Sequence, residues 1–201
     1  MDRRQFLKAL GVGVAGATLA TYGVVSSEYM DIFGFDEKVQ TGRTKNSIAA
    51  VVTGLVGQKL YGNSNIDVNI EKSLWPDAKV TGYTTPESVE THVDLALTSA
   101  HFSAKENQNG LLEGEVDKSE FDWKVKQTGS DSYDIARFGP KFDARLELRV
   151  QDGRISGTYI RPGPHFDWGI NGTYDQHGNV KFEIDGHANL GITLNGKITP
   201  K

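Results

Sequence analysis

The sequence contains no cysteine. Disulfide bonds, thiol nucleophiles, iron–sulfur clusters and cysteine-ligated zinc sites are therefore excluded, and a heme would lack its usual covalent attachment. The sequence also lacks a Gly-x-Ser-x-Gly motif, a phosphate-binding glycine loop and a dinucleotide fingerprint. Because no other cofactor motif is visible, we expect no bound cofactor, and we favour a protein without enzymatic activity.

Basic residues are not in excess either. With 22 Lys and Arg against 26 Asp and Glu, the formal net charge is −4, so no positive field attracts nucleic acid or an acidic membrane. Hydrophobic residues make up only 37%, whereas glycine is frequent, with 23 residues. Since the glycines follow no collagen period and nine Phe and seven Tyr are present, the composition indicates a folded domain with many turns. The 201 residues suffice for one domain plus a targeting segment.

The first 27 residues are predicted to be a targeting segment. They carry no charge between Ala9 and Ser27 and are richer in Gly and Ala than in Leu. The opening DRRQFLK resembles the twin-arginine export signal, Ser/Thr-Arg-Arg-x-Phe-Leu-Lys, with Asp2 in place of the usual Ser or Thr. The matching residues are Arg3, Arg4, Phe6, Leu7 and Lys8. An ordinary secretory signal, or a plain anchor that holds two arginines, is the alternative.

The resemblance implies that the twin-arginine translocation machinery is a partner and that the protein crosses the membrane already folded. The exported protein would be periplasmic, extracellular or membrane-anchored facing outward. As a helix, residues 9–27 would span about 28 Å, close to the hydrocarbon thickness of a bilayer. They would therefore hold the protein at the membrane only if the signal is not removed. Without a cofactor motif, folding before transport explains this route better than cofactor loading.

Beyond residues 1–27 we expect a tether over residues 28–47 and an all-β domain over residues 48–201. The tether shows no clear period and contains at most a short helical piece. From Ile48 onward apolar and polar residues alternate, which is typical of strands with one solvated face. No convincing helical stripe follows Ser47. The clearest alternating runs lie at 66–70, 93–97, 121–125 and 142–150.

About eleven or twelve such strands are predicted to form an antiparallel meander. Its apolar face must be covered, either by closing as an up-and-down β-barrel or by folding into a two-sheet β-sandwich. Glycine recurs in an apolar-x-Gly-x-apolar unit, and mid-strand glycines favour the strongly curved sheet of a barrel. The segment FDARLELRVQDGRISGTYI, followed by INGTY, resembles strand–turn–strand units of avidin and lipocalin-like barrels. The tryptophans of an avidin biotin site have no clear counterparts.

The turns predict the register of the last strands. A symmetric turn at 164–165 would place Arg161 opposite Trp168, stacked to close the hairpin. The next turn, DQHGN, would place Phe182 beside Gly172, where an aromatic ring covers a neighbouring-strand glycine.

The connection YIRPGPHFDWGI is predicted to be a hairpin tip first and the mouth of a binding site second. Its prolines end one strand, since proline cannot donate to the ladder. The ligand-binding candidates are Tyr159, Arg161, His165, Asp167 and Trp168. Pairing of the neighbouring strands would also bring His165 and Asp167 towards His187. Histidines in hairpin loops are mostly solvated, so we predict no metal site there.

Three classes of function remain open. The first is an exported module that binds a small ligand or an envelope component at one end of the barrel. The second is a structural or interaction protein of the cell envelope without a small ligand. The third is an enzyme on a lipocalin-like barrel. The interior distinguishes them, because a cavity lined by aromatic residues favours a ligand and a packed interior favours the envelope role.

Overall fold

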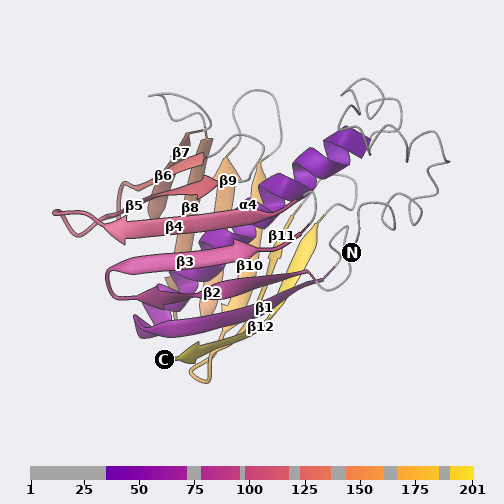
Figure 1. Cartoon of the computed structure of the whole chain (residues 1–201). Coiled ribbons are helices and arrows are strands. Elements are labelled where there is room, and N and C mark those ends of the chain that lie inside the picture. Colours follow the sequence, from indigo (N-terminus) through magenta and orange to yellow (C-terminus); the bar gives the residue numbers. More distant parts are fainter. Residues whose placement is uncertain are drawn as a thin grey trace. The chain divides into compact units, whose positions relative to one another are not determined.

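Twelve antiparallel strands close into a barrel in the part of the chain that the structure describes (Figure 1). The strands are β1 Ser64–Glu71, β2 Lys79–Thr85, β3 Ser88–Val93, β4 Ala100–Glu106, β5 Leu112–Asp117, β6 Trp123–Gln127, β7 Ser132–Ala136, β8 Ala144–Gln151, β9 Arg154–Ile160, β10 Trp168–Tyr174, β11 Asn179–Ile184 and β12 Ile192–Pro200. Each strand pairs with its neighbours in sequence, and β12 pairs with β1. The predicted up-and-down barrel is confirmed, and the sandwich is wrong.

The structure is a computed structural model. It describes residues 35–71, 78–95, 98–117, 123–136, 144–160, 167–185 and 191–201, with the backbone alone at 35–40. Residues 42–201 form one compact unit. The predicted boundary at residue 27 lies outside the described residues, and the division into signal, tether and domain stays a prediction.

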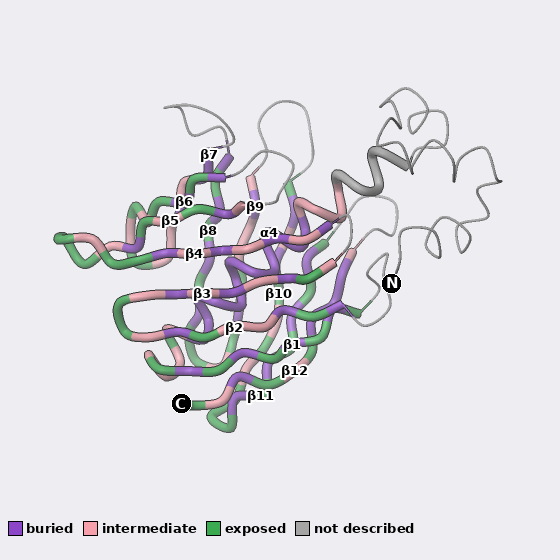
Figure 2. Tube along the Cα trace, in the orientation of Figure 1, coloured by how far each residue is buried: buried purple, intermediate pink, exposed green. Residues whose placement is uncertain are grey.

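Buried and more exposed residues alternate along the strands (Figure 2). In β8 the buried residues are Ala144, Leu146, Leu148 and Val150, and the residues between them are exposed. Each strand therefore contributes its apolar residues to one interior, as the period of two predicts.

A helix, α4, spans Phe35–Tyr61 and supplies the centre of this interior. Every residue from 45 to 57 is buried, so the helix has no solvent-facing side over that length. Figure 1 shows it running between the strands at the front, β3 and β4, and those behind, β9 and β10. The expectation that alternation begins at Ile48 is therefore wrong, because residues 48–61 are helical.

Contacts on several sides of α4 place it inside the barrel. The Thr91 hydroxyl of β3 donates a hydrogen bond of 2.8 Å to the Ala50 carbonyl. On another side, a β-carbon added to Gly57 would lie 2.9 Å from Ser64 Oγ of β1. The Tyr61 hydroxyl donates to a carbonyl in the turn that joins β10 and β11. The wall thus surrounds the helix.

The number of strands explains why a helix is needed. Eight strands already leave an interior just wide enough for side chains to fill, and the diameter grows with the strand number. A twelve-stranded barrel therefore needs further mass at its centre, and a helix satisfies its own backbone hydrogen bonds there. A helix buried all round shows no amphipathic stripe, and β-branched residues such as Val51, Val52 and Thr53 disfavour helices intrinsically. For both reasons, the sequence pattern does not predict the helix α4.

The two ends of the barrel differ. The connections from even to odd strands, such as Asp152–Gly153 between β8 and β9, lie at what we call the turn end. The opposite end, where odd-numbered strands such as β9 end and even-numbered strands such as β10 begin, is what we call the loop end. The Asn46 amide of α4 bonds to Thr98 at the loop end, and the Gln58 amide bonds to the Pro86 carbonyl at the turn end. The helix therefore runs from the loop end to the turn end.

The registers confirm most of the sequence pattern. Phe182 pairs with Gly172, as predicted. Asp152 and Gly153 both have positive φ, 50° and 76°, which fits the two-residue turn that QDGR predicts. The β9–β10 register differs from the prediction by two residues, because Trp168 pairs with Tyr159. A shift of two keeps each side chain on its face of the sheet, and Tyr159, Trp168 and Ile170 are buried.

No helix within the described residues has the length and apolar character needed to cross a membrane.

Candidate functional site

Three aromatic side chains meet inside the barrel at the loop end. Trp123 begins β6, Tyr159 lies near the end of β9, and Trp168 begins β10. The rings of Trp123 and Tyr159 are stacked, with centroids 5.8 Å apart, and those of Tyr159 and Trp168 are 5.6 Å apart. All three residues are at least nine-tenths buried. Offset contacts of this kind add about 0.5–1.5 kcal/mol per pair beyond the burial of area.

Lys45 of α4 extends this cluster with a positive charge. Its Nζ lies 5.2 Å from the centroid of the Trp168 ring, and the residue is 1% exposed. Burial lowers the pKa of the ammonium from 10.5 to about 8, and attraction to the Asp185 carboxylate partly offsets that effect. Lysine is rarely buried to this degree. A buried cation on an aromatic face suits the recognition of ligands with charge and π surface.

The neighbouring helix residues are polar and buried as well. The Asn46 amide donates hydrogen bonds to the Thr98 carbonyl at 2.8 Å and to its hydroxyl at 3.0 Å. Ser47 Oγ is buried and has no hydrogen-bond partner among the described residues. Three consecutive buried polar residues are unusual inside a barrel. They mark the loop end of α4 as the polar part of the interior.

The structure brings together two of the predicted candidates and leaves two outside its description. Tyr159 and Trp168 are adjacent, as given above. Asp167 is exposed, and Arg161 and His165 lie outside the described residues. The prediction that Arg161 stands opposite Trp168 is wrong, because the β9–β10 register places Tyr159 there. Among the described residues, Lys45 of α4 lies in cation–π contact with Trp168.

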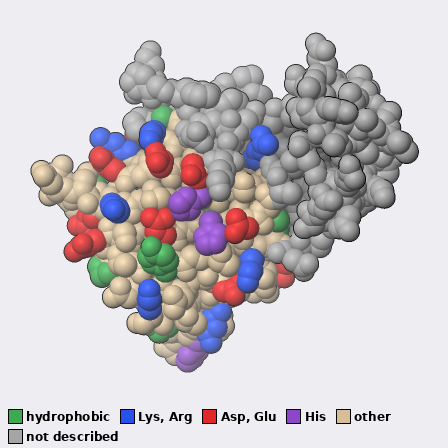
Figure 3. All heavy atoms as spheres, viewed as in Figure 1, with side chains coloured by type: hydrophobic (Ala, Val, Ile, Leu, Met, Phe, Trp, Pro, Cys, Tyr) green, Lys and Arg blue, Asp and Glu red, His purple; other side chains and the backbone are tan. Residues whose placement is uncertain are grey.

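His165 and His187, which the predicted strand pairing would bring near Asp167, lie outside the described residues. The most conspicuous described histidines are on the outer wall, where His92 and His101 are opposite each other on β3 and β4. His101 contacts Glu90 at 2.9 Å and Asp117 at 3.4 Å, and His92 contacts the Thr81 hydroxyl at 2.9 Å. Figure 3 shows histidines and charges of both signs on this face. Within the described ranges, no three His, Asp or Glu side chains are arranged to hold a metal ion.

Sequence reasoning missed Lys45, Trp123 and Asp185. Lys45 falls within the predicted tether, although the polar run KNS directly precedes the apolar IAAVV. The sequence pattern identifies Trp123 only as one residue of an alternating strand. Its proximity to Tyr159 depends on the curvature of the barrel, since β6 and β9 are not neighbours in the sheet.

The N-terminal residues match a known family of export signals. Residues 1–20 match the family described as TAT (twin-arginine translocation) pathway signal sequence. No curated protein and no solved structure matches the chain, so the resemblance of the barrel to avidin and lipocalin-like proteins is not confirmed. The chain thus carries a twin-arginine export signal ahead of a β-barrel, and it is a protein exported from the cytoplasm.

Proposed function

We propose that the protein is an exported binding module that holds a small ligand at the loop end of its barrel. The observation that carries this proposal is the Lys45 ammonium, buried against the Trp168 ring at 5.2 Å. Tyr159 and Trp123 continue the aromatic surface from Trp168. Binding sites combine such apolar surface with a few fixed polar groups.

The chemistry of these groups supports a planar ligand with an anionic substituent. The aromatic rings offer stacking surface, and the ammonium offers a charge-assisted hydrogen bond. With a pKa of about 8, Lys45 is mostly protonated at neutral pH. An anion beside it would raise that pKa, and binding would weaken as the pH rises above about 8.

The ligand is proposed for the end of the barrel because α4 fills the middle. Ile48, Val51 and Val52 have no exposed surface, so a lipocalin-like container is not supported along this part of the helix. The same packing favours a second candidate function, an interaction protein of the cell envelope without a small ligand. The charged outer wall would then carry the interface.

Native mass spectrometry of the exported full chain, followed by titration with naphthalene-2-sulfonate, tests the proposal. We expect saturable quenching of tryptophan fluorescence, with binding at least about tenfold weaker after Lys45→Met, which removes a charge-assisted contact. Lys181→Met is the matched control, because it removes the same charge from the exposed face of β11. An apo mass together with absence of saturation would contradict ligand binding and leave the interaction role.

A further inference from the structure

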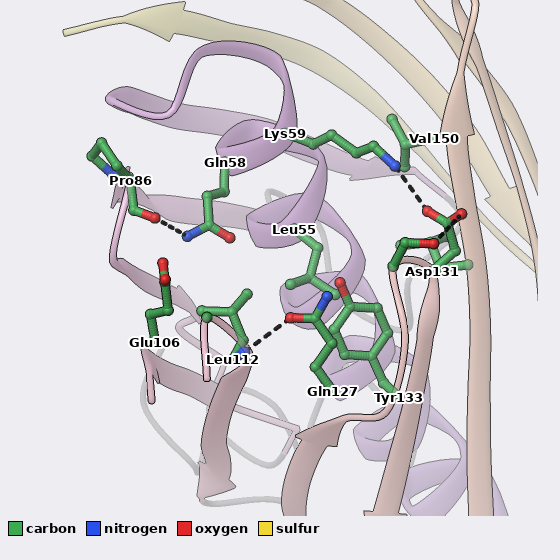
Figure 4. Close-up of a pocket in the computed structure, with 13 residues that line it drawn as sticks. Leu55, Gln58, Lys59, Pro86, Glu106, Leu112, Gln127, Asp131, Tyr133 and Val150 are labelled. Carbon is green, nitrogen blue, oxygen red and sulfur yellow. Dashed lines mark hydrogen bonds and ion pairs between the residues drawn. The ribbon is translucent and has the colours of Figure 1, made fainter. Parts of the chain in front are cut away.

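A cavity of about 230 Å³ opens at the turn end of the barrel, away from the aromatic cluster. Leu55, Gln58 and Lys59 of α4 form one side of it (Figure 4). Their spacing of three and four residues puts them on one face of the helix. The rest of the lining comes from β4 to β8, from the turns that join β4 to β5 and β6 to β7, and from Pro86 in the β2–β3 turn. The volume is below the range of roughly 300–1,000 Å³ for drug-sized ligands, so it suits a smaller molecule.

The inner part of the cavity is apolar. Leu55 from the helix and Leu112, Leu148 and Val150 from the strands are all at least nine-tenths buried. Tyr133 lies among them and is 7% exposed. This surface would bury a short hydrocarbon or a single ring, and burial contributes roughly 25 cal/mol per Å² of apolar area.

Two polar groups at the cavity have unused hydrogen-bonding capacity. Gln58 Nε2 donates to the carbonyls of Thr85 and Pro86 at 3.2 and 3.0 Å, which fixes the amide with its Oε1 turned away from Pro86 (Figure 4). Burial raises the pKa of Tyr133 to about 12, so its hydroxyl stays protonated. Among the described residues, neither the Gln58 Oε1 nor the Tyr133 hydroxyl has a hydrogen-bond partner.

The charge of the cavity is negative. Lys59 Nζ lies 2.8 Å from Asp131 Oδ1, so these two charges neutralise each other. The Glu106 carboxylate remains, and it has no ion-pair partner among the described residues. The C-terminal end of α4 adds partial negative charge, because helix dipoles favour cations near that end.

We infer that this cavity is a second binding site and takes a small organic cation with an apolar body, such as an arylalkyl amine. The ammonium group binds at the Glu106 carboxylate and the Gln58 Oε1. The apolar body packs on Leu112, Leu148 and the Tyr133 ring, and the Tyr133 hydroxyl donates to a polar substituent. This site is separate from the loop-end site, where Lys45 selects the opposite charge.

Titration of the exported full chain with benzylamine tests the inference, with benzyl alcohol and benzoate as neutral and anionic comparisons. We expect saturable binding of benzylamine, weaker binding of benzyl alcohol and weakest binding of benzoate, read from NMR shifts of the leucine methyls at the turn end. Glu106→Gln weakens benzylamine binding about tenfold and leaves benzyl alcohol unchanged, since only the charged contact is lost.

Glu183→Gln is the matched control, because Glu183 is exposed on β11 and does not line the cavity. It leaves benzylamine binding unchanged. Two results would overturn the inference: no saturation by benzylamine up to about 20 mM, well beyond the weak end of specific binding, or equal binding of benzylamine and benzoate. Neither result bears on the loop-end site, which is tested with a different probe and with Lys45→Met.

Discussion

Gly54 of α4 and Val89 of β3 are in direct contact. A β-carbon placed on Gly54 would overlap with Cγ1 of Val89. The glycine therefore lets the helix backbone approach the wall, and this pair reports directly on whether α4 lies inside the barrel.

We predict that Gly54→Ala destabilises the protein by about 1–3 kcal/mol, the usual range for overpacking a core. In an exposed helix the same change would stabilise by about 1 kcal/mol, so the sign of the effect separates a buried helix from a solvated one. Chemical denaturation measures it. Gly129→Ala is the control, because no atom lies within 4 Å of its added β-carbon. Val89→Ala in the Gly54→Ala background is expected to restore part of the loss, and additive effects would contradict the contact.

Lys45→Met is expected to stabilise the protein at pH 7, because a buried charge is replaced by an apolar side chain of similar length. Below pH about 8 the lysine is protonated in both the folded and unfolded states. Between about 8 and 10.5 the folded protein has released a proton that the unfolded chain still holds, so wild-type stability increases with pH in this window. The gain is on the order of 3 kcal/mol.

The measurement is the free energy of unfolding of wild type and Lys45→Met from pH 7 to 10, below the range in which Tyr133 titrates. The difference between the two proteins should shrink as the pH rises. A constant difference would show that the Lys45 pKa is not lowered.

Lys59→Met is expected to raise the pKa of Asp131. The hydrogen bond from Lys59 is the largest cause that holds this pKa below its usual 3.8. The stabilisation is present above the usual pKa and is lost as the pH falls through the lowered one. Since both side chains are partly exposed, it amounts to less than about 1 kcal/mol. Carbon-13 NMR of the carboxylate measures the pKa, and Arg149→Met, which removes a smaller cause, should move it less.

Replacement of Arg3 and Arg4 by Lys is expected to retain the protein in the cytoplasm, because the twin-arginine machinery reads the arginine pair and not the charge. Fractionation and immunoblotting measure the location. Arg154→Lys, on the barrel surface, makes the same chemical change and should leave export intact. Continued export of the double variant would show that another route accepts the N-terminus.

The sequence predicts the strands of the barrel better than the helix and the side-chain cluster in its interior. A period of two, glycine positions and the QDGR turn depend on neighbours in the chain or on the adjacent strand, so they can be read locally. Phe182 beside Gly172 was predicted for this reason. The predicted β9–β10 register differs from the observed register by two residues, because the prediction assumes a symmetric turn.

The helix and the loop-end cluster depend on the closed barrel and could not be read in this way. In the sequence, Ile48 and Val51 fit a strand pattern. In the structure they are buried residues of a helix that twelve strands surround. In the sequence, Lys45 fits a solvated tether. In the structure it is buried against the ring of Trp168, a residue distant in the chain. Such features follow from the diameter and curvature of the barrel and are not encoded in a local pattern.

The pairing of β1 with β12 also determines when the barrel can close during synthesis of the chain. Among the described elements, α4 and β1 are synthesised first, and β12, which closes the barrel around the helix, is synthesised last. The Lys201 amide donates a hydrogen bond to the Asn63 carbonyl beside this β1–β12 pairing. Contacts between such distant segments form slowly. Until β12 arrives, the apolar surface of α4 has no complete cover and invites aggregation. The twin-arginine signal fits this requirement, because a transporter that accepts folded proteins allows the barrel to close in the cytoplasm before export.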